Sequence, residues 1–146
     1  MIVLDAYPVV ALLGNEPAAA EIGQLILHET AVIPAPNLAE AIDQLGRGHR
    51  IAEDRTRSAI ESLQESTDLR IRPVDERAAW RAGTLRVRHY RRRDCPVSIA
   101  DCLLLAVTGP EDRVATADPQ VLAVAQAEGI AWIALPDSTG QRHPPA

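Results

Sequence analysis

The first thirteen residues place one carboxylate between two apolar runs, and this pattern restricts the fold more than any other part of the chain. The run from Ile2 to Leu4 has no alternating polar residue, so it predicts a short strand buried on both faces. The run at 6–13 predicts a helix directly after it. Strands of this kind occur in parallel sheets that helices cover on both sides. Asp5 lies at the junction, where a charge either caps the helix or serves a function.

The rest of the chain alternates between short apolar runs and amphipathic segments. Further strands are expected at 31–33, 69–72, 113–116 and 130–135. Helices are expected at 18–28, from Asn37 to Gly46, and at 51–65, 76–92, 98–108 and 118–129. This order predicts an α/β protein of three layers (α/β/α) with a central, mostly parallel sheet. We expect one domain at 1–136 and a disordered tail at 137–146, because the tail has no apolar face.

The composition excludes several classes of protein. The 15 basic residues are all arginine, and with 20 acidic residues they give a net charge of −5. An acidic balance argues against a general polyanion-binding protein, although metal ions can supply positive charge locally. The absence of lysine argues against phosphoacceptor receiver domains, and no Gly-Lys-Ser/Thr or G-x-G-x-x-G loop supports nucleotide binding. No apolar run reaches the ~18 residues of a membrane span, and the two cysteines predict reduced thiols in a cytoplasmic protein.

Asp101 is the acid that a capping role explains least well. It is the single charge in the apolar segment 97–107, where desolvation of a carboxylate is costly unless a cation compensates it. Ser98 and Asp101 also fit a cap at the start of the helix, since an acid in the first turn suits the helix dipole. We favour a functional role for Asp101, with Ser98 as an auxiliary residue.

Two further acids have simpler local explanations. Glu40 lies three residues after Asn37, a spacing that resembles a capping box. Asp118 precedes Pro119, and a cap followed by proline at the first helical position explains it fully. Thr116, two residues earlier, is either an ordinary strand-end residue or an auxiliary group that binds water or a ligand.

All four acids fall at predicted strand ends or in first helical turns: Asp5, Glu40, Asp101 and Asp118. The carboxyl ends of parallel strands meet at one edge of the sheet, where ligands bind. Carboxylates that converge there repel one another, and a hard divalent cation such as Mg²⁺ removes that cost. We therefore predict one acidic cleft whose metal ions promote hydrolysis of a phosphodiester in nucleic acid.

Four motifs occur in an order typical of one family: IVLDAYPVVALL at 2–13, NLAEAIDQL at 37–45, SIADCLLLA at 98–106 and VATADPQVL at 114–122. With them the chain resembles PIN-domain ribonucleases, specifically VapC-type toxins of toxin–antitoxin pairs, over residues 2 to about 135. The resemblance implies a PIN-like fold and Mg²⁺ or Mn²⁺ held by the four acids. It also implies endonucleolytic cleavage of RNA by metal-activated water, a homodimer, and inhibition by a cognate antitoxin.

One residue departs from the pattern of the family. Many members carry Ser or Thr two residues after the first acid, where this chain has Tyr7, which is expected to narrow the cleft. The alternative to a nuclease is a PIN-like domain that binds RNA or a protein without cutting, and the four intact acids argue against it.

The segment RVRHYRRR at 86–93 gathers most of the local positive charge. It fits the solvated end of a helix, where cations suit the dipole, and it fits a surface that contacts RNA phosphates and stacks a base on tyrosine. In an acidic protein this clustering favours RNA contact by Arg86, Arg88, Arg91, Arg92 and Arg93.

Overall fold

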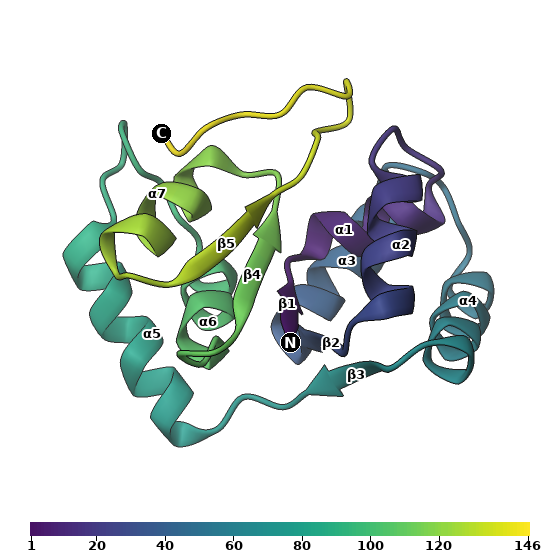
Figure 1. Cartoon of the computed structure of the whole chain (residues 1–146), viewed down its shortest axis with the longest axis horizontal. Helices are drawn as coiled ribbons and strands as arrows, with labels where there is room; N and C mark the ends of the chain where they lie inside the picture. Colours follow the sequence, from purple (N-terminus) through teal and green to yellow (C-terminus); the bar gives the residue numbers. More distant parts are fainter.

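A computed structural model describes all residues 1–146 and contains one sheet of five parallel strands (Figure 1). The strands are β1 (Ile2–Leu4), β2 (Ala31–Pro34), β3 (Leu69–Arg72), β4 (Arg113–Thr116) and β5 (Ala131–Ala134). Their order across the sheet is β3-β2-β1-β4-β5, so the first strand of the chain lies in the middle. The predicted α/β fold with a parallel central sheet is confirmed.

Seven helices connect and cover the strands: α1 (Ala6–Leu13), α2 (Ala19–His28), α3 (Ala35–Arg47), α4 (Glu53–Ser66), α5 (Glu76–His89), α6 (Ile99–Val107) and α7 (Pro119–Ala127). In the view of Figure 1, α1 to α4 lie to the right of β1, and α5 to α7 lie to its left. None of these helices is both long enough and apolar enough to cross a membrane.

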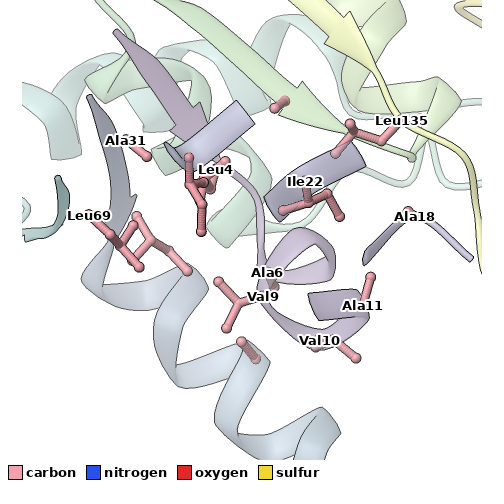
Figure 2. Packing of buried hydrophobic residues seen from close by; sticks show 14 of the residues in the cluster. Leu4, Ala6, Val9, Val10, Ala11, Ala18, Ile22, Ala31, Leu69 and Leu135 are labelled. Carbon is pink, nitrogen blue, oxygen red and sulfur yellow. The ribbon is translucent and has the colours of Figure 1, made fainter. Parts of the chain in front are cut away.

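The sheet separates two apolar cores because successive strand residues point to opposite faces. Leu4 of β1 packs in the first core with Ile22 of α2, and Figure 2 shows both among the side chains of α1. Val3 belongs to the second core, with Leu104 of α6 and Val121 of α7. All five side chains are almost completely buried, and each contributes roughly 1.5–3 kcal/mol to stability.

Helix α3 begins two residues earlier than predicted. It starts at Ala35 rather than Asn37, and Pro36 lies in its first turn. Proline is accepted there because the first backbone N–H groups of a helix have no partner within it. Asn37 is therefore not a cap but part of the helix, and its side chain is fully buried.

Helix α5 ends earlier than predicted. It stops at His89 rather than at about Arg92, because Tyr90 adopts an extended conformation. The chain then turns, and Arg91 and Cys95 exchange two backbone hydrogen bonds of 2.9 Å.

The C-terminal segment, which the sequence predicts to be disordered, makes defined contacts. Arg142 donates to the carbonyl of Ala134 and forms an ion pair of 2.8 Å with Glu21 of α2. Asp137 accepts hydrogen bonds from Thr139, and these bonds hold the carboxylate beside the cleft described next.

Candidate metal centre

A cleft of about 540 Å³ opens beyond the carboxyl ends of β1 and β4, and all four predicted acids line it. Carboxylate oxygens of Asp5, Glu40 and Asp101 lie within 4.8 Å of one another. Asp118 lines the same cleft but falls outside this cluster. The fold thus brings together residues that are up to 113 positions apart between Asp5 and Asp118.

Asp5 is the most firmly held of the acids. Its backbone amide donates to Ala115 of β4, which continues the sheet to the edge of the cleft. Its Oδ1 accepts from the Ala6 amide at 2.7 Å and from Asn37 Nδ2 at 3.2 Å. Its Oδ2 accepts from the Thr116 hydroxyl at 2.6 Å. Three donors, from α1, α3 and β4, therefore fix the position and orientation of this carboxylate.

Burial dominates the electrostatics of Asp5. The residue is 7% exposed, and desolvation raises its pKa from 3.8 to about 6. The hydrogen bond from Thr116 opposes the rise, while the negative charges of Asp101 and Asp118 add to it. A carboxylate in this environment is stabilised in its charged form when a cation is bound nearby.

Asp101 both caps α6 and belongs to the cluster. Its Oδ2 accepts from the Ser98 amide at 2.6 Å, and the Ser98 hydroxyl accepts from the Asp101 amide at 3.0 Å, which completes a capping box. The pKa of Asp101 is raised, mainly by burial, although the hydrogen bond from the Ser98 amide to its carboxylate opposes the rise. The cap uses one carboxylate oxygen and fixes the side chain, so a cap at this position is compatible with the predicted role of Asp101 in the cleft.

Glu40 does not cap a helix, and the capping-box interpretation of this residue is wrong. Because α3 starts at Ala35, Glu40 lies in the second turn, and its carboxylate makes no hydrogen bond within the chain. Burial and the charges of Asp101 and Asp5 raise its pKa. A half-buried acid that faces two others without a donor of its own fits a position beside a cation.

Asp118 is joined to the centre through Thr116. Its Oδ1 accepts from the Gln120 amide at 2.7 Å and caps α7, as the proline after it predicts. Its backbone amide donates to the Thr116 hydroxyl at 3.0 Å, and that hydroxyl donates to Asp5. Thr116 is therefore a positioning residue that connects two acids across the ends of neighbouring strands.

Asn37 is the residue at this centre that sequence reasoning missed. It is fully buried, donates to Asp5, and leaves its Oδ1 without a partner. A signal was present, because Asn37 continues the buried stripe of Ala41 and Leu45 at four-residue spacing. The cleft also includes Asp137 from the C-terminal segment, which nothing in the sequence associated with the other acids.

The donor set fits a hard divalent cation. All the clustered donors are carboxylate oxygens, which suit Mg²⁺ and Mn²⁺, and the cluster contains no cysteine or histidine of the kind that selects zinc. The pKa values of Asp5, Glu40 and Asp101 are all raised, so three acids share a site that disfavours their combined charge. Asp5, Glu40 and Asp101 would hold the ion, with Asp118 at the rim of the cleft.

The arginine segment lies outside the lining of the cleft. Arg86 donates to the carbonyl of Val97 at 2.7 Å, and its guanidinium lies 4.2 Å from the centroid of the Tyr90 ring. Arg88 forms an ion pair of 2.6 Å with Glu128. These contacts fix the end of α5.

The other three arginines of the segment are exposed: Arg91, Arg92 and Arg93. Their guanidinium groups form no ion pair with an acid of the chain, so they are available to a charged partner. RNA contact by the segment stays a prediction.

Comparison with known proteins agrees with this geometry. A family model described as the PIN domain matches residues 2–138. The chain belongs to the PIN domain family. The predicted family membership is therefore confirmed, and the match includes all four acids of the cleft.

Solved structures have the same PIN fold. The chain is similar to FitAcB from Neisseria gonorrhoeae, with a TM-score of 0.63 and 21% identity over 91% of this chain and 96% of that one. It is also similar to VapBC2 from Rickettsia felis bound to a promoter DNA fragment, with a TM-score of 0.66 and 14% identity over 92% and 99% of the two chains.

A third similar structure is DNA-bound VapBC from Salmonella typhimurium, with a TM-score of 0.63 and 19% identity over 90% of this chain and 96% of that one. At these identities the likeness establishes the fold. No curated protein matches the chain in sequence.

Proposed function

We propose that this PIN domain is a metal-dependent endoribonuclease and the toxin of a toxin–antitoxin pair. One observation carries the proposal: the carboxylates of Asp5 directly after β1, Glu40 in α3 and Asp101 in α6 converge within 4.8 Å in a cleft at the carboxyl ends of parallel strands. Such convergence costs free energy without a cation and is suited to binding one. A divalent ion in this position supplies positive charge for the scissile phosphate and lowers the pKa of the attacking water.

Neighbouring polar residues fix the orientation of the carboxylates that would hold the metal ion. Asn37 donates to one oxygen of Asp5 and Thr116 to the other, so that the carboxylate keeps one orientation in the cleft. Ser98 does the same for Asp101 through the capping box. Neighbouring groups that fix metal ligands commonly change metal affinity or activity by about 10–100-fold when they are removed.

Cleavage of RNA by the purified chain tests the proposal. We expect cleavage with Mn²⁺ or Mg²⁺, none with EDTA, and a fall to background in Asp101→Asn. Asp54→Asn, on the exposed face of α4, is the matched control and should cut like the wild type. If the wild type cuts no RNA with either metal, or Asp101→Asn cuts at the full rate, the chain is not this nuclease. RNA binding without cutting would favour the inactive PIN-like alternative.

A cognate antitoxin is the partner that we propose for this chain. The solved structures with the same fold include toxin–antitoxin complexes. A groove between α3 and α4 offers an apolar lining for a partner segment, including Leu38, Ile42, Ile60 and Ile71. The Ile42→Glu variant should lose a co-purifying antitoxin but keep its RNA cleavage. If the antitoxin still co-purifies, this groove is not the docking site.

A second copy of the chain is the partner that we propose for the outer face of α5. Trp80 is 74% exposed and Val87 86% exposed, and with Gly83 between them they follow the three- and four-residue spacing of a helix seam. An antiparallel pair centred at Gly83 would pack Trp80 against the other copy's Val87. It would also bring the acidic end at Glu76 near the basic end at Arg91. Light scattering should give a dimer for the wild type and a monomer for Val87→Glu, whereas a dimer in both would exclude this face.

A further inference from the structure

The C-terminal loop, residues 136–146, runs beside the metal cleft. After β5 it passes toward α1 and α2 and then turns back over α7 (Figure 1). Two of its residues, Asp137 and Ser138, belong to the lining of the cleft. The backbone amide of Ala146 donates to the carbonyl of Pro119, and Pro119 also lines the cleft. The loop therefore contacts the cleft near both of its ends.

Hydrogen bonds within the C-terminal loop close it on itself. The Asp137 carboxylate accepts from three residues further along the loop: Thr139, Gln141 and His143. Gly140 turns the chain between them with a φ of 83°, a conformation that glycine adopts without strain. None of these bonds involves the rest of the protein, so the loop can keep its shape when it moves.

The contacts that hold the C-terminal loop against the protein are few and exposed. No residue after Leu135 is buried, so the loop contributes little apolar burial. The ion pair between Arg142 and Glu21 leaves the two side chains 48% and 38% exposed, and water screens such pairs strongly. Gly140 lies against Pro17, since a Cβ at residue 140 would be 3.5 Å from that of Pro17. Segments with so few buried contacts open locally at a low cost in free energy.

Ser138 lies at the boundary between the cleft and a neighbouring hollow of about 390 Å³. Both are lined by Tyr7 of α1, Gln44 of α3 and Ser138, so two helices and the C-terminal loop make up their shared boundary. From there the hollow extends to Arg47 at the end of α3. Movement of the loop would join the cleft and the hollow into one longer groove that leads away from the metal centre.

The C-terminal loop also brings a negative charge to the cleft. Asp137 lines the cleft but lies outside the cluster of carboxylates within 4.8 Å of one another. RNA phosphates are negatively charged and are repelled by a carboxylate that no cation neutralises. The loop therefore opposes the entry of RNA by its charge as well as by the space that it fills.

We propose that the C-terminal loop is a strap that partly closes the RNA path at the metal centre, and that its release after Leu135 opens this path. In the closed position, the loop narrows the groove and holds Asp137 beside the entering phosphates. In the open position, the groove continues from the acids into the neighbouring hollow, so a strand can extend past the phosphodiester that is cut. This regulation rests on the proposed ribonuclease function and acts on the same cleft.

Reversal of the ion pair tests the strap in the full chain. Arg142→Glu places two acids side by side and should release the loop, which raises the rate of cleavage at low RNA concentration about two- to fivefold. The added negative charge by itself would slow cleavage, because it repels RNA. The double variant Glu21→Arg, Arg142→Glu restores an ion pair and should cut at the wild-type rate. Arg55→Glu, on the exposed face of α4, makes the same change of charge outside the cleft and should not speed cleavage.

The same variants state what would overturn the strap. If Arg142→Glu cuts RNA no faster than the wild type, release of the loop does not open the path. If the double variant cuts as fast as Arg142→Glu, the ion pair does not hold the loop closed.

Two further measurements separate failure of the strap from failure of the nuclease. NMR should show a nuclear Overhauser effect between Gly140 and Pro17 in the wild type and the double variant, and a weaker one or none in Arg142→Glu. RNA binding in the Asp101→Asn background, followed by fluorescence anisotropy, should be about two- to fivefold tighter when Arg142→Glu is added. Tighter binding by a chain that cuts no RNA would refute the nuclease and keep the strap. RNA cleavage with equal binding by all variants, or a wild type without the Overhauser effect, would refute the strap alone. Absence of both cleavage and binding would refute both.

Discussion

The buried carboxylate of Asp5 makes the stability of the metal-free protein depend on pH. Its pKa is 3.8 without the folded environment and about 6 within it. Between these values the folded state binds more protons than the unfolded state, so the free energy of unfolding falls as the pH rises. One pKa unit corresponds to about 1.4 kcal/mol, so ionised Asp5 costs about 3 kcal/mol near neutral pH.

The other carboxylates with a shifted pKa change the free energy of unfolding either at lower pH than Asp5 does or in the same direction as Asp5. Four acids have a lowered pKa in the folded protein: Glu29, Asp68, Glu128 and Asp137. Their stabilisation is lost only when the pH falls through those lowered values, below about pH 4.5. Burial raises the pKa of Glu40 and Asp101, so both acids make the free energy of unfolding fall more steeply as the pH rises.

Urea unfolding in EDTA, followed by tryptophan fluorescence at several values between about pH 4.5 and 7.5, measures this effect. We expect the free energy of unfolding of the wild type to fall across this range, and that of Asp5→Asn to fall much less. Near neutral pH the variant should be more stable by about 2–3 kcal/mol, because its amide carries no charge. Asp54→Asn should follow the wild type. A wild-type stability that is constant or rises across this range, or an Asp5→Asn variant less stable than the wild type near neutral pH, would refute the reasoning.

Three further predictions concern positioning and charge. Asn37→Ala should bind Mn²⁺ about tenfold or more weakly in calorimetric titration, because a donor that orients a metal ligand is lost; unchanged affinity would contradict this. Ser98→Ala should lower the free energy of unfolding by about 1 kcal/mol and also weaken Mn²⁺ binding, since Asp101 loses its capping partner; a loss of stability alone would show a cap without a role in the site. For RNA binding by the double variant Arg92→Gln, Arg93→Gln, the slope of the logarithm of the binding constant against the logarithm of the salt concentration should be smaller by about one or two. An unchanged slope would exclude RNA contact by these residues.

The fold could be predicted because each strand is short, apolar and followed by a helix signal. Ile2, Val3 and Leu4 are apolar on both faces of β1, and this requires cover on both sides of the sheet. The start of α3 was missed because proline usually precedes a helix or occupies its first position, and here Pro36 is the second helical residue.

The acids of the site could be predicted from the sequence, but the hydrogen-bond donors that orient them could not. Asp101 stood out as a charge in an apolar helix, and Asp5 as a charge between two apolar runs. The hydrogen bond from Asn37 to Asp5 joins residues 32 positions apart, and the one from Thr116 joins residues 111 apart. Such pairs depend on the order of strands in the sheet, which no local pattern in the sequence specifies.

Direct titration of the metal-free protein with Mn²⁺, followed by the electron paramagnetic resonance of the free ion, tests the central claim that Asp5, Glu40 and Asp101 hold a divalent cation. We predict saturable binding to the wild type and affinity about tenfold or more weaker in Asp101→Asn, which removes one charged ligand. Asp54→Asn should bind Mn²⁺ like the wild type. Identical titrations for the wild type and Asp101→Asn, or no saturable binding at all, would contradict a metal centre in this cleft.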